Sequence, residues 1–107
     1  MKLPPQELGQ HILASLPGAV ERAEDLQGEL TITVRADAVV PVLTFLRDDA
    51  KCLFKQLMDV CGVDYPDREH RFDVVYHLLS LKLNQRIRVK LETDEHTPVP
   101  SVTGVFS

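Results

Sequence analysis

The sequence predicts an α+β fold, in which a mainly antiparallel sheet of about five strands carries two helices on one face. Two observations support this prediction. Several short runs alternate apolar and polar residues and are joined by turn residues, which is typical of half-buried antiparallel strands. Two other segments space their apolar residues for one face of a helix. The length of 107 residues suits one domain, covering residues 1–107.

The first helix is predicted to begin at Pro4-Pro5, because proline fits the first helical position. Pro17-Gly18 should end this helix. Between these two points the apolar residues repeat at helical spacing. The predicted buried face consists of Leu8, Ile12, Leu13 and Leu16.

A β-hairpin is expected next. Its first strand, Val20–Leu26, is a weak candidate because it is rich in acidic residues, and Gln27-Gly28 supplies the turn. In the second strand Leu30, Ile32 and Val34 alternate with polar residues. The second strand is therefore the stronger prediction.

The second helix has the clearest amphipathic pattern in the chain. Asp37 is a good N-cap residue, and Pro41 lies in the first turn, where a missing amide hydrogen costs least. Asp48-Asp49 opposes the helix dipole, so we expect the helix to end there. The apolar stripe consists of Val39, Val42, Leu43 and Leu46.

Three more strands are predicted over residues 57–65, 71–81 and 86–93, after an ambiguous segment at 51–56. The last two are joined by Leu83-Asn84-Gln85. One face of this pair should hold Phe72, Val74, Tyr76, Leu78, Ile87, Val89 and Leu91 and pack against the helices. The opposite face should hold the basic stripe Arg86, Arg88 and Lys90.

A final helix start is expected at Pro100-Ser101, with Ser101 as its cap. Val102, Val105 and Phe106 begin an apolar stripe that the chain does not complete. We therefore expect the chain to be the N-terminal part of a longer protein.

Composition limits the classes of function. Hydrophobic residues make up 44% and charged residues 26%, as in ordinary soluble domains. The net charge of −4 is a poor basis for binding nucleic acid, whose phosphates need a basic surface. No apolar run approaches the roughly 20 residues that span a bilayer.

Catalytic, cofactor-binding and metal-binding residues are not identified from the sequence. Cys52 and Cys61 are too few and too far apart for an iron–sulfur cluster, and we interpret them as free thiols of a reducing compartment. No two of the four histidines have the spacing of a metal site on a helix, and His77 is interpreted as a strand surface residue near Asp73. Asp64, Asp67 and Glu69 are interpreted as a solvated turn, partly neutralised by nearby arginines.

Four segments resemble one protein family in their order and spacing. They are LMDVCGVDYPDRE (57–69), RFDVVYHLLSL (71–81), QRIRVKLET (85–93) and PVPSVTGVF (98–106). Together they cover 42 of the 107 residues. The chain is thus similar to the C subunit of bacterial proton-pumping NADH–quinone oxidoreductase, respiratory complex I, in its N-terminal domain.

The resemblance implies a structural and assembly role in the peripheral arm of that complex. A protein of this kind supports electron transfer from NADH to quinone and carries no redox cofactor itself. The partners that the resemblance implies are other peripheral-arm subunits, chiefly the D subunit, which helps to form the quinone site. The implied location is the cytoplasmic side of the bacterial inner membrane, peripheral to the bilayer.

Candidate partner-contacting residues come from the charged and apolar positions that the helices should leave uncovered. Leu79 and Leu81 share a face with Val75 and His77, so they are either a docking surface or covered by the C-terminal segment. The basic stripe could contact an acidic protein surface. The predicted interface is Arg68, Arg71, His77, Leu79, Leu81, Arg86, Arg88 and Lys90.

Three other interpretations stay open at the level of sequence. A small regulatory or ligand-binding domain would need a concave site with convergent polar groups. An enzyme would gather residues such as Asp64, Tyr65 and His77 in a cleft. A nucleic-acid-binding protein would use Arg86, Arg88 and Lys90, and its binding would weaken steeply with salt.

Overall fold

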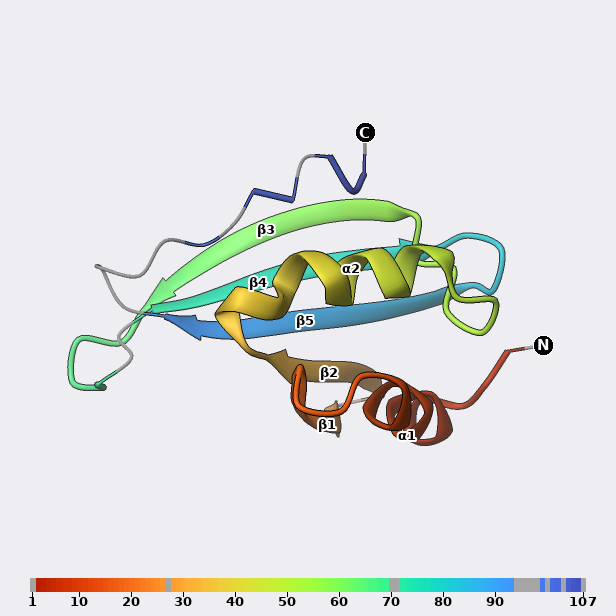
Figure 1. Cartoon of the computed structure of the whole chain (residues 1–107), viewed down its shortest axis with the longest axis horizontal. Coiled ribbons are helices and arrows are strands. Elements are labelled where there is room, and N and C mark those ends of the chain that lie inside the picture. Colours follow the sequence, from red (N-terminus) through yellow and green to blue (C-terminus); the bar gives the residue numbers. More distant parts are fainter. Residues whose placement is uncertain are drawn as a thin grey trace.

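The computed structural model describes residues 2–26, 28–69, 72–93, 99, 101–102 and 104–106. Over these residues the chain forms two α-helices, one 3-10 helix and five strands (Figure 1). The helices are α1 (Pro5–Ser15), η1 (Ala36–Ala38) and α2 (Val39–Asp48). The strands are β1 (Val20–Leu26), β2 (Glu29–Val34), β3 (Gln56–Asp64), β4 (Phe72–Ser80) and β5 (Gln85–Thr93). The predicted order of elements is confirmed, with strand bounds within one residue where a range was given.

The strands form one sheet in the order β1-β2-β5-β4-β3. Neighbouring strands are antiparallel except β2 and β5, which run parallel. The mainly antiparallel sheet is therefore confirmed. The last strand in the sequence lies in the middle of the sheet, where it joins the N-terminal hairpin to β4 and β3.

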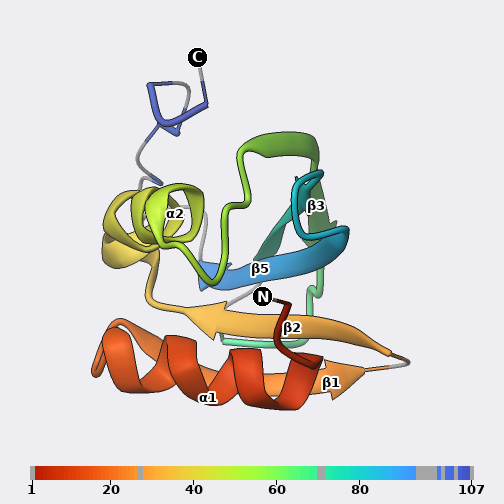
Figure 2. The ribbon, with the colours of Figure 1, turned by 90° about the vertical axis from the view of Figure 1, so that its right-hand side faces the viewer.

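A single core fills the space between the sheet and the helices. α1 lies along β1 and β2, whereas α2 lies over β5 and β4 (Figures 1 and 2). Both helices contribute to one cluster of buried apolar side chains, which confirms that they share one face of the sheet. Its fully buried members include Ile12, Ile32, Val39, Val42, Leu43, Leu46, Ile87, Val89 and Leu91.

The start of α2 corrects one sequence prediction. Asp37 is not the N-cap, because the 3-10 helix η1 precedes α2 and Ala38 occupies the cap position. The Asp37 carboxylate instead accepts hydrogen bonds from the Arg35 guanidinium at 3.1 and 2.5 Å. Arg35 lies only two residues away, and its charge competes successfully with the backbone amides for the carboxylate.

The ambiguous segment at 51–56 is a turn that leads directly into β3. Leu46 O accepts a hydrogen bond from Phe54 N at 2.8 Å, which folds the chain back on the end of α2. Leu53 adopts a positive φ of 51°, a conformation that a leucine rarely takes. The fully buried ring of Phe54 holds this turn against the core.

The C-terminal residues form a turn rather than a helix over the part that the structure describes. Val105 N donates to Val102 O at 3.0 Å, and Arg47 Nη1 donates to Val105 O at 2.8 Å. Val105 is buried in the core, and Val102 and Phe106 pack against it. The predicted cap region is incomplete, because Pro100 lies outside the described residues. In the described part of the chain, neither helix is long and apolar enough to cross a membrane.

The contact between α1 and the hairpin depends on Gly9. A Cβ atom at Gly9 would lie 3.2 Å from both Ala23 Cβ and Leu30 Cδ1, so the absence of a side chain permits the close approach. Gly62 in β3 has no such neighbours within 4 Å. Gly9 and Gly62 can therefore be compared as a crowded and an open position for an added side chain.

We expect Gly9→Val to lower the free energy of unfolding by about 1–3 kcal/mol, because overpacking must push α1 away from β1. Helix propensity does not account for this loss, since valine is no worse than glycine in a helix. Gly62→Val should leave stability unchanged or slightly raised. Urea unfolding of the two variants measures the difference, and equal stabilities would show that α1 tolerates a shift.

Candidate interaction surface

The face of the sheet opposite the helices carries charges of both signs. Strand pairing sets five side chains in one row across the sheet, from β1 to β3. The row is Glu24, Thr31, Arg88, His77 and Asp59. We call this side the mixed-charge face. Besides that row, it contains Arg22, Glu29, Asp73, Leu79, Arg86, Lys90 and Glu92.

An acidic neighbour pairs with one member of the predicted basic stripe, Arg88. Arg88 Nε lies 3.7 Å from Glu29 Oε1, and its Nη2 donates to Leu26 O at 3.4 Å. Arg22 contacts Glu24 at 3.3 Å and Glu92 at 3.8 Å. A surface that mixes both signs suits a protein partner with complementary charges better than a phosphate backbone.

Two cations of the face differ from the others in their surroundings. Among the described residues, Arg86 and Lys90 have no carboxylate within 4 Å. Next to Lys90 in the register, Thr33 is 1% exposed although it lies on the side without helices. Its neighbours across β2 are Lys90 and Arg22, whose long aliphatic stems are of a kind that covers a small neighbouring residue.

Arg68 lies at one end of the mixed-charge face. Its Nη2 donates to Asp73 Oδ1 at 2.5 Å, and its guanidinium stacks over the Tyr65 ring at 4.1 Å from the centroid. Asp73 is buried, whereas Arg68 is partly exposed. The arginine therefore supplies the positive charge that a buried carboxylate needs. The same ion pair anchors the turn after β3 to β4.

An apolar patch lies at the other end of the face. Leu79 and Leu81, together with Leu53, line a cavity of about 310 Å³. The Leu81 side chain is 68% exposed. The described C-terminal residues do not cover it, because Val102 and Phe106 line a different groove with Met58 and Val60 of β3. Among the described residues, coverage by the C-terminal segment is thus not observed, and docking stays a prediction.

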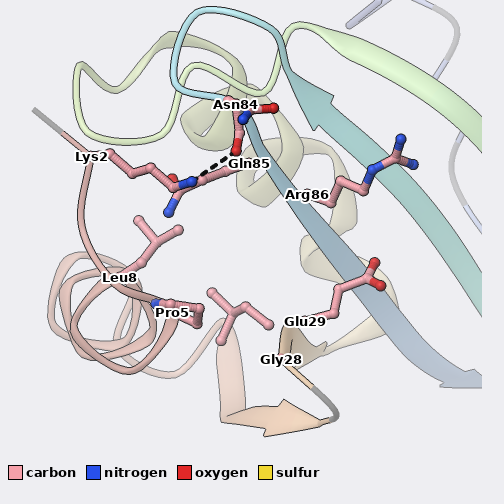
Figure 3. Close-up of a pocket in the computed structure, with 9 residues that line it drawn as sticks. Lys2, Pro5, Leu8, Gly28, Glu29, Asn84, Gln85 and Arg86 are labelled. Carbon is pink, nitrogen blue, oxygen red and sulfur yellow. Dashed lines mark hydrogen bonds between the residues drawn. The ribbon is translucent and has the colours of Figure 1, made fainter.

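A separate pocket opens between α1 and the turn before β5. It has a volume of about 500 Å³, with Pro5, Leu8 and Leu30 on its apolar side (Figure 3). Lys2 Nζ donates to Asn84 O at 3.0 Å, and the Arg86 side chain points away from Lys2 (Figure 3). The charged groups that line this pocket do not converge on a common point, as they would around a small polar ligand.

One cluster was not found from the sequence. His11 of α1 and Asp49 at the end of α2 form a contact of 2.9 Å, although 38 residues separate them. Cys52 completes a group whose ligand atoms all lie within 4.8 Å of one another. Burial opposes the charge on Asp49, but hydrogen bonds from His11 and from Lys51 N outweigh it, so the Asp49 pKa is lowered. Burial raises the pKa of the Cys52 thiol.

The structure brings most of the predicted interface residues together. His77, Leu79, Arg86, Arg88 and Lys90 lie on the mixed-charge face, with Leu81 and Arg68 at its ends. Arg71 lies outside the described residues. Cys52 and Cys61 are free thiols, as predicted. Each of the five strands contributes one acidic member of the face, and alternation within the strands was the only signal that pointed to them. They are Glu24, Glu29, Asp59, Asp73 and Glu92.

A family model described as "Respiratory-chain NADH dehydrogenase, 30 Kd subunit" matches residues 32–107. Proteins named as the C subunit of NADH-quinone oxidoreductase are similar over nearly the whole chain. The protein of Paramagnetospirillum magneticum is 63% identical over 103 residues, which are 95% of this chain and 52% of the relative. That of Rhodospirillum rubrum is 56% identical over 102 residues, with 95% and 48% covered. The chain spans about half the length of the curated relatives it matches.

One solved structure supports the fold independently. It is described as "Structure of the membrane-bound sulfane sulfur reductase (MBS), an archaeal respiratory membrane complex". A chain of that complex matches with a TM-score of 0.76 and 24% identity. The match covers 94% of this chain and 58% of that one. At this level of identity the similarity concerns the fold alone.

The ion pair of Arg68 with Asp73 provides a test of how the face is held together. We expect Arg68→Ala to lower the melting temperature by about 4–8 °C, because it leaves a buried carboxylate without its cation. Arg35→Ala breaks a contact of the same 2.5 Å with Asp37, but both partners are exposed, so the melting temperature should hardly change. Thermal unfolding followed by circular dichroism compares the two. Equal losses would mean that the burial of Asp73 is unimportant.

Proposed function

Because the chain belongs to the family of the respiratory-chain NADH dehydrogenase 30 Kd subunit, we propose that it is a structural and assembly part of a proton-pumping NADH–quinone oxidoreductase. In this role it holds other subunits of the peripheral arm in place, so that electrons from NADH reach quinone. It carries no redox group of its own in this proposal. Its location would be the cytoplasmic side of the bacterial inner membrane, bound through the complex.

The observation that carries this proposal is the family membership, shared by relatives named as the C subunit that are more than 50% identical. The structure supports it with a well-packed core on one side and a charged face on the other. An assembly role needs a rigid domain that presents an uncovered surface. The sheet provides the rigidity, since β5 is hydrogen-bonded to neighbours on both sides.

The mixed-charge face is the surface that we assign to the partner, chiefly the D subunit of the peripheral arm. It carries charges of both signs at fixed positions, which favours one orientation of a complementary partner and disfavours others. The exposed Leu81 and the adjoining Leu79 add apolar area at the edge of the face. Apolar contact surrounded by charged groups is the usual composition of a protein interface.

Binding of this chain to the D subunit of the same organism tests the proposal. We expect co-expressed proteins to elute together in size-exclusion chromatography. Arg86→Glu should weaken the complex by about tenfold or more, since that cation has no acidic partner within the described chain. Leu81→Asp should weaken it similarly, and neither exposed position should affect folding.

Lys51→Glu is the matched control, because Lys51 is an exposed cation in the turn after α2, away from the mixed-charge face. It should leave the affinity unchanged. Binding that ignores both Arg86→Glu and Leu81→Asp would contradict the assigned surface. A well-folded chain that does not bind the D subunit at all would contradict the partner.

A further inference from the structure

His11, Asp49 and Cys52 form a compact group of three different donor atoms. The imidazole nitrogen, carboxylate oxygen and thiol sulfur all lie within 4.8 Å of one another. No other group of this kind occurs among the described residues. Cys61 shows the contrast, since its sulfur also contacts a carboxylate, that of Asp59 at 3.1 Å, but no histidine nitrogen joins these two in the described part of the chain.

The backbone positions two of the three donors. Asp49 is the C-cap of α2, and its carbonyl oxygen accepts hydrogen bonds from Cys52 N at 2.9 Å and Leu53 N at 3.0 Å. This tight turn brings the Cys52 side chain back beside the Asp49 carboxylate. Leu53, with its positive φ, completes the reversal. The turn therefore fixes the position of Cys52 relative to Asp49.

The third donor comes from α1. Ile12, the residue after His11, is fully buried in the core, so the helix is held in register there. The His11 ring lies 6.0 Å from the Phe45 ring of α2, measured between centroids. Three donors on two packed elements are therefore placed before any ligand arrives, which reduces the entropy cost of binding.

The donor set selects a class of ion. A nitrogen, a sulfur and a carboxylate oxygen are the ligands that zinc accepts, whereas magnesium and calcium require oxygen ligands. A thiolate and a carboxylate together balance the charge of a divalent cation. Tetrahedral zinc needs donors about 3.3–3.5 Å apart. The present separations are 4.8 Å or less, so the three donors already lie near that arrangement.

We propose that His11, Asp49 and Cys52 form a binding site for a zinc-type divalent cation, with water at the fourth position. The His11 and Asp49 side chains are 22% and 23% exposed, so the ion has access from solvent, while Cys52 closes the inner side. A bound ion would join α1 to the end of α2. This site lies among the helices, and its existence does not depend on the partner proposed above.

Cobalt binding to the 107-residue chain tests the site directly, because tetrahedral cobalt reports its ligands in the absorption spectrum. We expect a thiolate-to-cobalt charge-transfer band together with visible d–d bands. Cys52→Ser should abolish the charge-transfer band. Cys61→Ser is the matched control and should keep it, since Cys61 lies in β3 outside the group.

Thermal unfolding with zinc provides a second measurement, whose readout does not use the thiolate absorption band. At zinc concentrations about a hundredfold above Kd, the melting temperature should rise by about 10 °C or more. His11→Gln should weaken zinc binding by at least about a hundredfold and remove most of that rise, although the variant itself is expected to fold. The absence of a cobalt–thiolate band in the folded wild-type chain would overturn the proposal. So would a band that is lost in Cys61→Ser and kept in Cys52→Ser.

Discussion

The parallel pairing of β2 with β5 is the constraint on which the rest of the structure depends. Within the described residues it is the one parallel pairing of two strands, and it joins Leu30–Val34 to Ile87–Leu91 across more than half of the chain. Parallel strands need a long crossover, and here the crossover contains α2, β3 and β4. Because the central strand is the last to be made, the core is complete only when both halves of the chain meet.

The same pairing produces the charge pattern of the mixed-charge face. It places Arg88 beside Thr31 and near Glu29, so that one cation of a stripe that looks basic in the sequence is paired from the neighbouring strand. Among the described residues, Arg86 and Lys90 have no such partner. The electrostatic character of the surface is therefore a property of the topology and is not evident from the sequence of β5 alone.

The difference between local sequence patterns and contacts set by the topology explains how far the sequence could predict the structure. Local patterns were sufficient for α1, α2 and the strands, since burial of the Val39, Val42, Leu43 and Leu46 stripe follows directly from helical spacing. The Asp37 cap was wrong because a nearby arginine competed for the carboxylate. The contact of His11 with Asp49 could not be predicted, because it depends on how α1 packs against α2 across 38 residues.

The two sides of the sheet can therefore serve separate purposes. On the helix side, the His11, Asp49 and Cys52 group links α1 to the end of α2. On the opposite side, the charged residues of β4 and β5 face away from the helices and therefore away from these three side chains. An ion bound among the helices would stiffen the support of the sheet without altering the charges that a partner meets. Stability and recognition in this domain thus rest on different residues, and changes in one need not disturb the other.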